Sequence, residues 1–416
     1  MRPASVLAAF LIFLTAAAAH AAVPPTYILV DVDSGKVLAD HDSGKVWHPA
    51  SLSKLMTAYV TFQALRAGRL KMTSPVTESA NAQAEPPSKM GFQVGTVMNL
   101  DNALKMMLVH SANDIAVAIA EAVGGSEERF VAQMNATARG LGMNSTHYDN
   151  PNGLPDDGQL TTARDMAVLA RALWVNFPEY RDYFRIPAIK AGRRVLRSQN
   201  MLLTRYPGSN GMKTGFICAS GYNIVASATH GGRTMLAVVL GADSSNDRAE
   251  TAAKLLNQGF AGALSGFTPV DLAGFRVASS AGPAADLHDA VCKGRHIVEE
   301  DDSPVLAGAF SPGSALEPPI QAMPPVVVFT GHTDQVMPLA PAATTKVAVD
   351  PAPAPAAAAV IPATRDVNPA PRSKGIPVPR LRPQYPAGAE LNGFDFDQRF
   401  DPSTVSDSSG GRKVLR

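Results

Sequence analysis

Residues 48–60 read HPASLSKLMTAYV and place a serine, Ser51, three positions before a lysine, Lys54. Apolar side chains recur here at intervals of three and four, which predicts a helix over 51–66 with one apolar face. Ser51 and Lys54 would then lie one turn apart on the same face. A neutral lysine amine beside a serine hydroxyl can take its proton and make it a nucleophile. The ordinary alternative is an N-capping serine followed by a surface lysine.

The composition excludes several classes of protein. The 416 residues are 46% hydrophobic and 18% charged, enough for a sizeable core in one large domain or two. The 37 Lys and Arg balance the 36 Asp and Glu, so the basic excess of a nucleic-acid-binding protein is missing. The 9 histidines show no metal-binding spacing, and no glycine-rich loop has phosphate-binding spacing. We therefore expect no nucleic acid partner, no metal and no cofactor.

The first 21 residues, MRPASVLAAFLIFLTAAAAHA, have the parts of a secretory signal peptide. A positive residue near the start precedes an apolar run over 6–14, and residues 19–21 form a small-x-small cleavage signal. The apolar run is short for a bilayer span, which disfavours an uncleaved anchor. We expect export to the periplasm or cell envelope. There the 2 cysteines, Cys218 and Cys292, could form a disulfide or remain two free thiols.

Strand signals begin the mature chain, helical periodicity fills its middle, and strand signals then return. The pattern predicts helices over about 101–109, 114–123, 126–140, 161–175 and 248–256, and hairpins over 27–42 and 222–242. This order predicts an α+β fold in which the first and last strands meet in one sheet, with helices packed on it.

The chain after residue 264 carries weaker signals. VDLAGFRVA, residues 270–278, and PPVVVFTG, residues 324–331, could each be a single strand. From residue 341 proline and alanine dominate without periodicity, so a packed core is not expected. We divide the chain into a signal peptide (1–21), a main domain (22–263), a poorly defined segment (264–340) and a disordered Pro/Ala-rich tail (341–416).

Two further motifs change the meaning of the serine and lysine, since S-x-x-K alone occurs by chance in many chains. HSAND contains Ser111-Ala112-Asn113 between two predicted helices, and GMKTGF contains Lys213-Thr214-Gly215 just before the second hairpin. Serine β-lactamases and penicillin-binding proteins carry S-x-x-K, S-x-N and K-T-G in this order. The agreement of all three indicates a catalytic site around Ser51.

Residues 26–260 resemble the low-molecular-mass penicillin-binding proteins, the serine-type D-alanyl-D-alanine carboxypeptidases of peptidase family S11. The likeness extends to PASLSKLMTAY, MNATARGLGM, STHYDNPNGL, TTARDMAVLARAL and SGYNIVASAT. It implies a serine β-lactamase/penicillin-binding transpeptidase-like fold, an antiparallel sheet with packed helices and an inserted helical region. Many members add a β-domain and an amphipathic anchoring helix. Here the region after 264 is proline-rich, and the sequence leaves membrane association open.

The resemblance also implies a role for each motif residue. Ser51 would attack the penultimate carbonyl, Lys54 would take its proton, and Ser111 would relay a proton to the leaving amine. The backbone N–H groups of Ser51 and Phe216 would form the oxyanion hole. For Arg248, a solvated arginine at a helix start is an equal alternative to carboxylate binding. The residues expected to bind substrate are Asn113, Lys213, Thr214, Gly215, Phe216 and Arg248.

The activity implied is removal of the terminal D-alanine from peptidoglycan stem peptides through an acyl-enzyme, with β-lactam antibiotics as covalent inhibitors. A D,D-endopeptidase or a serine β-lactamase could use the same machinery. A β-lactamase needs a carboxylate that activates the deacylating water, and the sequence offers no convincing one, since Glu121 and Glu127 lie in helical stretches. A non-catalytic cell-wall-binding module is the remaining alternative, disfavoured by the intact motifs. A Cys218–Cys292 bridge would tie the C-terminal segment to the rim of the site.

Overall fold

The computed structural model describes residues 25–262, 267–277, 283–293, 313–319 and 323–331. All of these lie in the first of two compact units, Met1–Thr344, and the second unit is Thr345–Arg416. The predicted signal peptide and the predicted disordered tail, 341–416, lie outside the described residues.

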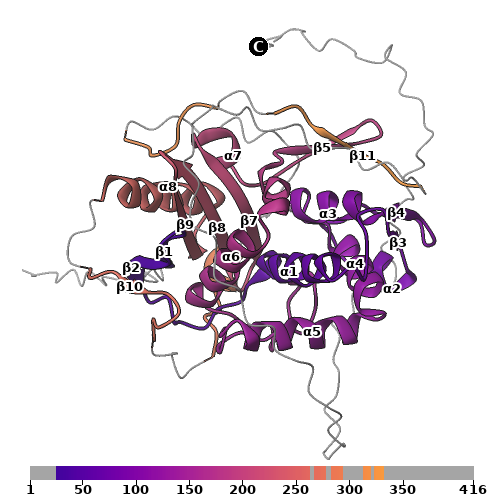
Figure 1. Cartoon of the computed structure of the whole chain (residues 1–416), viewed down its shortest axis with the longest axis horizontal. Helices are drawn as coiled ribbons and strands as arrows, with labels where there is room; N and C mark the ends of the chain where they lie inside the picture. Colours follow the sequence, from indigo (N-terminus) through magenta and orange to yellow (C-terminus); the bar gives the residue numbers. More distant parts are fainter. Residues whose placement is uncertain (1–24, 263–266, 278–282, 294–312, 320–322, 332–416) are drawn as a thin grey trace, which may run out of the picture. The chain divides into compact units, whose positions relative to one another are not determined.

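A six-stranded antiparallel sheet forms the centre of the domain, with the strand order β10-β2-β1-β9-β8-β7 (Figure 1). Strand β1 pairs with β9 from Thr26 opposite Leu240 to Asp31 opposite Met235, so the predicted meeting of first and last strands is confirmed. The strands are β1 (Thr26–Asp31), β2 (Lys36–His41), β7 (Ser209–Ile217), β8 (Gly221–His230), β9 (Arg233–Ala242) and β10 (Val270–Asp271).

The β8–β9 hairpin closes with a two-residue turn. His230 pairs with Arg233, and the intervening Gly231 and Gly232 have φ values of 55° and 80°. A two-residue turn with both central residues at positive φ matches the right-handed twist of the strands, and glycine adopts it at no steric cost. The sequence His-Gly-Gly therefore fixes this register.

Both faces of the sheet are buried, which explains why its long strands are almost continuously apolar. On one face, Leu29 and Val239 pack against helix α8 (Ser245–Ala261). On the other face, Val30 and Val238 join the core formed with the remaining long helices. Figure 1 shows α8 on one side of the sheet and α1, α3, α4 and α5 on the other.

A helical region of the chain is inserted between β2 and β7, and every helix predicted from periodicity is present. Helix α1 is buried nearly all round, so the prediction of one apolar face is wrong for it. Its buried hydroxyls are bonded within the fold, such as Thr57 Oγ1 to the Pro151 carbonyl at 2.6 Å. The elements are the 3₁₀ turn η1 (Ala50–Leu52), α1 (Ser53–Arg66), α3 (Leu100–Val109), α4 (Asn113–Gly124), α5 (Glu127–Gly140) and α6 (Ala163–Asn176).

Several short elements were not predicted, because most of them have only three or four residues and carry no periodicity; the eight-residue 3₁₀ helix η2 was missed as well. Of the two weak signals after 264, the first forms only β10 and the second contains β11 (Val326–Val328), which pairs in parallel with β5. The short elements are β3 (Pro75–Thr77), α2 (Ala80–Gln83), β4 (Val97–Asn99), η2 (Pro178–Arg185), β5 (Ala188–Ala191), β6 (Arg194–Arg197), α7 (Leu202–Arg205) and α9 (His288–Val291).

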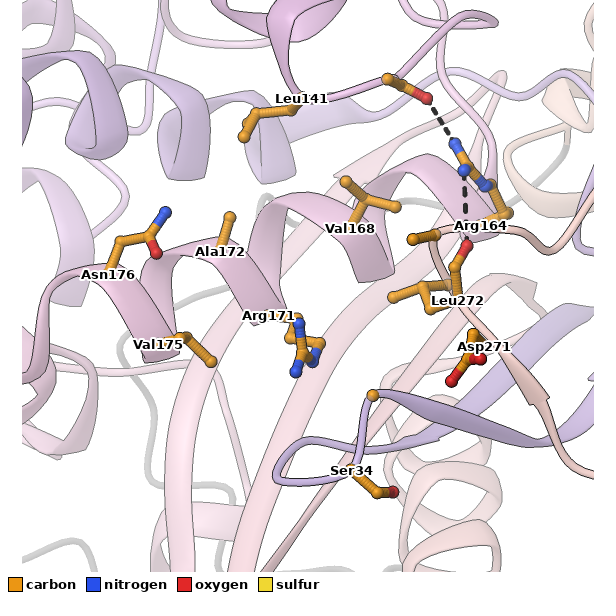
Figure 2. Close-up of a pocket in the computed structure, with 13 residues that line it drawn as sticks. Ser34, Leu141, Arg164, Val168, Arg171, Ala172, Val175, Asn176, Asp271 and Leu272 are labelled. Carbon is orange, nitrogen blue, oxygen red and sulfur yellow. Dashed lines mark hydrogen bonds between the residues drawn. The ribbon is translucent and has the colours of Figure 1, made fainter. Parts of the chain in front are cut away.

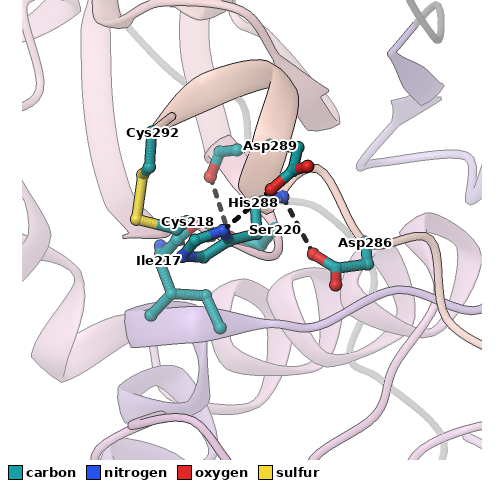
Figure 3. The surroundings of a disulfide bond; sticks show 8 residues. Ile217, Cys218, Ser220, Asp286, His288, Asp289 and Cys292 are labelled. Atoms are coloured by element: carbon teal, nitrogen blue, oxygen red, sulfur yellow. Dashed lines mark hydrogen bonds and ion pairs between the residues drawn. A yellow bond between two sulfur atoms is a disulfide. The ribbon is translucent and has the colours of Figure 1, made fainter. Parts of the chain in front are cut away.

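A disulfide joins the segment around α9 to the β7–β8 turn (Figure 3). Cys218 and Cys292 are 74 residues apart in sequence, and their Cα atoms are 5.7 Å apart. The backbone N–H of Leu287 donates to the carbonyl of Ala219 at 2.9 Å, and Leu287 and Val291 are buried. The bridge thus fastens a C-terminal segment to the end of the strand that carries the K-T-G motif.

We expect the double variant Cys218→Ser/Cys292→Ser to be about 2–4 kcal/mol less stable to unfolding, because a loop of this length is no longer closed in the unfolded chain. Urea denaturation with and without reductant measures this. Reductant should lower the unfolding midpoint of the wild type to that of the variant and leave the variant unchanged. Equal midpoints for oxidised wild type and variant would contradict a stabilising bridge.

Candidate active site

The first motif places its serine and lysine in contact at the start of α1. Lys54 Nζ lies 3.0 Å from Ser51 Oγ. The lysine is fully buried, whereas Ser51, in η1, is only half-buried. A ligand can therefore reach the hydroxyl while the amine stays away from bulk water.

The other partners of the Lys54 amine are both oxygens that can only accept. Nζ donates to Asn113 Oδ1 at 2.7 Å and to the carbonyl of Asn152 at 2.7 Å. A neutral amine has two N–H groups and one lone pair. With both N–H groups used in this way, the lone pair is directed at the Ser51 hydroxyl. This geometry suits Lys54 to act as a general base that accepts the proton of Ser51.

Electrostatics favour this neutral form. Burial lowers the pKa of Lys54 well below its ordinary value, and the positive charge of Lys213 lowers it further. The carboxylates of Asp114 and Glu85 act in the opposite direction but are the smaller causes. A lysine whose pKa is lowered by desolvation and a like charge is suited to act as a general base.

A second serine–lysine pair comes from the other two motifs. Lys213, on β7, donates from Nζ to Ser111 Oγ at 2.9 Å and to the carbonyl of Thr214 at 2.8 Å. All three residues are buried. Ser111 lies between α3 and α4 with φ 63°, a left-handed conformation that is rare outside glycine and often found at functional sites. Two residues later, Asn113 contacts Lys54, so both pairs belong to one site.

Strand β7 runs against the backbone of η1 at the K-T-G glycine. A Cβ atom added to Gly215 would lie 3.0 Å from both the Pro49 carbonyl oxygen and the Ser51 nitrogen. Only glycine allows this close approach without a shift of the neighbouring backbone. It brings the strand that carries Phe216 alongside the Ser51 N–H. Ser51 and Phe216 are the two residues expected to supply the oxyanion hole.

Arg248 lies inside the fold rather than in solvent. It is 1% exposed, so the alternative of a solvated arginine at a helix start is wrong. Its guanidinium donates to the Gln199 carbonyl at 3.1 Å and lies 5.5 Å from the centre of the Tyr222 ring. That ring packs on Phe216, with centroids 4.4 Å apart. Arg248 thus supports the residues that follow the K-T-G motif.

Sequence reasoning missed the contribution of the Asn150–Gly153 turn. No role was expected for this turn, whereas the Asn152 carbonyl is a partner of Lys54. Gly153 has φ 88°, and a Cβ atom on it would lie 1.8 Å from the Ala50 carbonyl oxygen. Gly153 was the available sequence signal for this contact, because only a residue without a Cβ atom lets the turn pack against the backbone next to Ser51.

Glu85 is a carboxylate near the site that sequence reasoning did not consider. Glu85 Oε2 accepts a hydrogen bond from Asn152 Nδ2 at 3.0 Å, and its charge raises the pKa of Lys54. Glu85 comes from an irregular loop far from all three motifs in sequence, so no local pattern points to it.

A cavity of about 410 Å³ lies elsewhere, between α6, the β1–β2 turn and residues 271–273 (Figure 2). Arg164, Val168, Arg171 and Leu272 are among the residues that line it. It shares no residue with the three motifs, so the chemistry of the serine and lysine pairs is not located there. Within the described ranges, no group of three His, Cys, Asp or Glu side chains is arranged to hold a metal ion. None of the helices in the described part is both long and apolar enough to cross a bilayer.

Comparison with curated proteins finds several relatives. D-alanyl-D-alanine carboxypeptidase DacC of Escherichia coli is 38% identical over 241 residues, which cover 56% of this chain and 60% of the relative. DacF of Bacillus subtilis is 36% identical over 239 residues, covering 56% and 61%. The chain thus matches about 60% of the length of these relatives.

Solved structures show the same fold. D-alanyl-D-alanine carboxypeptidase DacD of Francisella tularensis superposes with a TM-score of 0.55 at 31% identity, covering 57% of this chain and 70% of that one. Penicillin-binding protein D2 of Listeria monocytogenes, solved in a cefotaxime-bound form, gives 0.52 at 28% identity, covering 57% and 97%.

The family profile described as D-alanyl-D-alanine carboxypeptidase matches residues 14–244, more than half of the chain. Together with the penicillin-binding fold and the two serine–lysine pairs, this match shows that the chain belongs to the D-alanyl-D-alanine carboxypeptidase family, peptidase family S11.

Proposed function

We propose that the chain is a serine-type carboxypeptidase that removes the terminal D-alanine from peptidoglycan stem peptides through an acyl-enzyme on Ser51. One observation carries the proposal. A fully buried lysine amine, held by two oxygens that can only accept, lies 3.0 Å from a half-buried serine hydroxyl. This arrangement makes a nucleophile that a peptide can reach.

The acylation step follows from the positions of these groups. The substrate's terminal carboxylate is attracted by the charge of Lys213 and can accept a hydrogen bond from the Thr214 hydroxyl. Ser51 Oγ attacks the carbonyl carbon of the penultimate residue while its proton passes to Lys54 Nζ. The oxyanion that forms accepts from the Ser51 and Phe216 N–H groups, and removal of such a donor typically costs about 3–4 kcal/mol of transition-state stabilisation.

Release of D-alanine requires a proton on the leaving nitrogen. Lys213 Nζ donates to Ser111 Oγ, which occupies a lone pair of that oxygen and leaves its O–H free to point at the leaving amine. The C–N bond breaks as Ser111 delivers its proton to the leaving nitrogen. The proton that Lys54 took from Ser51 then passes to Ser111, so Lys54 is neutral again. Water then attacks the ester, with Lys54 taking its proton, and Ser51 is restored.

β-Lactam antibiotics would acylate Ser51 by the same attack. Opening of the lactam ring leaves the amine tethered to the acyl group, so it does not diffuse away as D-alanine does. The cefotaxime- and ampicillin-bound structures of the Listeria monocytogenes relative support this part of the proposal.

Export to the periplasm or cell envelope belongs to the same proposal. The signal-peptide pattern of residues 1–21 and the location of the substrate class both favour it. A disulfide between Cys218 and Cys292 supports an oxidising compartment.

The Glu85 carboxylate favours a serine β-lactamase as a second candidate, because such an enzyme needs a carboxylate near the acylated serine. Against this, Glu85 already accepts from Asn152. A chromogenic cephalosporin separates the candidates. We expect slow, stoichiometric acylation; rapid turnover in the wild type that is lost in Glu85→Gln would favour the β-lactamase.

We expect Ser51→Ala to lose D-alanine release from a pentapeptide ending in D-Ala-D-Ala by a factor on the order of 10⁴, because loss of the nucleophile leaves only substrate binding and the oxyanion hole. Labelling by a fluorescent penicillin should disappear as well. Ser34→Ala, which changes an exposed serine in the β1–β2 turn, is the matched control and should keep both activities. A penicillin adduct mapped to another side chain would refute the assignment.

We expect the acylation rate to rise with pH through the pKa of Lys54 and then to level off, because only the neutral amine accepts the serine proton. Since burial lowers this pKa well below the ordinary lysine value, the enzyme should remain active near neutral pH. Lys54→Arg keeps the charge but cannot deprotonate, so acylation should fall about 10²- to 10⁴-fold at every pH. Stopped-flow measurement of the acylation rate from about pH 5 to about pH 8 tests both expectations. A pH-dependent rate retained by Lys54→Arg would exclude Lys54 as the base.

A further inference from the structure

Asp114 immediately follows the S-x-N motif, in the first turn of α4, and is fully buried. Its carboxylate accepts hydrogen bonds from three backbone N–H groups. Oδ1 accepts from Met90 at 3.1 Å and from Ile115 at 2.8 Å, and Oδ2 accepts from Gly91 at 2.8 Å. One side chain therefore ties an irregular loop, residues 86–91, to the start of α4.

The same loop holds the amide of Asn113. The Pro86 carbonyl accepts from Asn113 Nδ2 at 2.9 Å, and the Ser88 carbonyl accepts from the Asn113 backbone N–H at 2.7 Å. A side-chain amide whose NH₂ group is bound on one side presents its oxygen on the other. That oxygen accepts from Lys54 Nζ at 2.7 Å. The reverse orientation would set an NH₂ group against the N–H groups of the lysine and leave buried donors unpaired.

We propose that Asp114 is a positioning residue for the acylation of Ser51. By anchoring the loop 86–91, it fixes the Asn113 amide with its oxygen toward Lys54, and so keeps the lysine lone pair on the serine. Asp114 acts through Asn113 and Lys54 and does not touch the substrate. This inference rests on the proposed function, since it concerns the reaction of Ser51.

The charge of Asp114 supplies a second, electrostatic effect on the same base. It raises the pKa of Lys54, against burial and the charge of Lys213, and Glu85 acts in the same direction more weakly. Burial raises the pKa of Asp114 itself, while the hydrogen bonds from Gly91, Met90 and Ile115 oppose that rise. A substitution that removes the charge should therefore change the pH at which Lys54 becomes a base.

Glu78 is a second buried carboxyl group near Asp114, and near neutral pH Asp114 is the charged member of these two. It is fully buried, and among the described residues neither of its carboxyl oxygens has a hydrogen-bond partner. Burial and then the charge of Asp114 raise the pKa of Glu78 to about 8; Lys89 lowers it and Glu121 raises it further. Near neutral pH Glu78 is protonated, and the three N–H donors favour the negative charge on Asp114.

Asp114→Asn tests the proposal, because it keeps the size of the side chain but leaves one accepting oxygen and no charge. We measure the second-order rate of acylation by a fluorescent penicillin as a function of pH. The plateau rate should fall about 10- to 100-fold, as expected when reacting groups are misplaced. The acid limb of the pH–rate profile is the range in which the rate rises as Lys54 loses its proton. This limb should move to lower pH, because Lys54 loses a neighbour that favours its charged form. Loss of stability alone would not move that limb.

The matched control is Asp31→Asn. Asp31 is also buried, and its carboxylate also accepts a backbone N–H, from Ser34 at 3.0 Å, but it lies on β1 beside Arg233. Its plateau rate and its acid limb should equal those of the wild type. If Asp114→Asn retains both as well, the proposed role of Asp114 is wrong. If the wild type itself is not acylated, the proposed function fails instead.

Glu78→Gln tests the coupling of Asp114 to the reaction without requiring that the Asp114 variant folds. In the wild type, ionisation of Glu78 above about pH 8 places a second negative charge beside Asp114 and should lower the acylation rate. Glu78→Gln should keep its plateau rate at that pH. An alkaline decline of the same size and midpoint in both proteins would overturn the coupling of Asp114 to the reaction.

Discussion

The site depends on keeping one lysine amine dry and neutral. Removing Lys54 from water disfavours its ammonium form, and the oxygens that contact it, Asn113 Oδ1 and the Asn152 carbonyl, carry no charge. A carboxylate in direct contact would have stabilised the ammonium and removed the base. The chain instead places its carboxylates one step further away, on Asp114 and Glu85, where they moderate the pKa of Lys54 without binding its proton. The amine is thus neutral because it is desolvated, and its two N–H groups still have hydrogen-bond acceptors.

This requirement explains why distant parts of the chain converge. The base comes from α1, one acceptor from the start of α4, the other from the turn before residue 153, and the second lysine from an edge strand of the sheet. Each approach is tight enough to need a special residue, as at Gly153 and Gly215. The antiparallel sheet supplies the rigid reference, because β1 and β9 pair along their length and anchor both ends of the domain.

Much of this could be predicted from the sequence. Periodicity over ten or more residues identified the long helices, and glycine-marked hairpins and the return of strand signals gave the sheet. The short strands β3 to β6 were missed because segments of three or four residues carry too little periodicity, even where two of them form a local hairpin, as β5 and β6 do. Helix α1 was misjudged because Lys54, Thr57 and Thr61 are polar yet buried. Lys54 and Thr57 donate to carbonyls far away in sequence, and Thr61 donates to the Thr57 carbonyl one turn earlier in the same helix.

For the site, residues that act through side chains in ordered motifs could be named, and the structure brings Ser51, Lys54, Ser111, Asn113 and Lys213 together. Residues that act through the backbone could not. Asn152 contributes a carbonyl, which every residue has, and the loop 86–91 contributes two more. The disulfide has a consequence of a different kind. Cys218 and Cys292 close a covalent ring around β8, β9 and α8. A protease that cuts once between these cysteines would leave two fragments still joined, so the nicked protein would migrate as an intact chain until it is reduced.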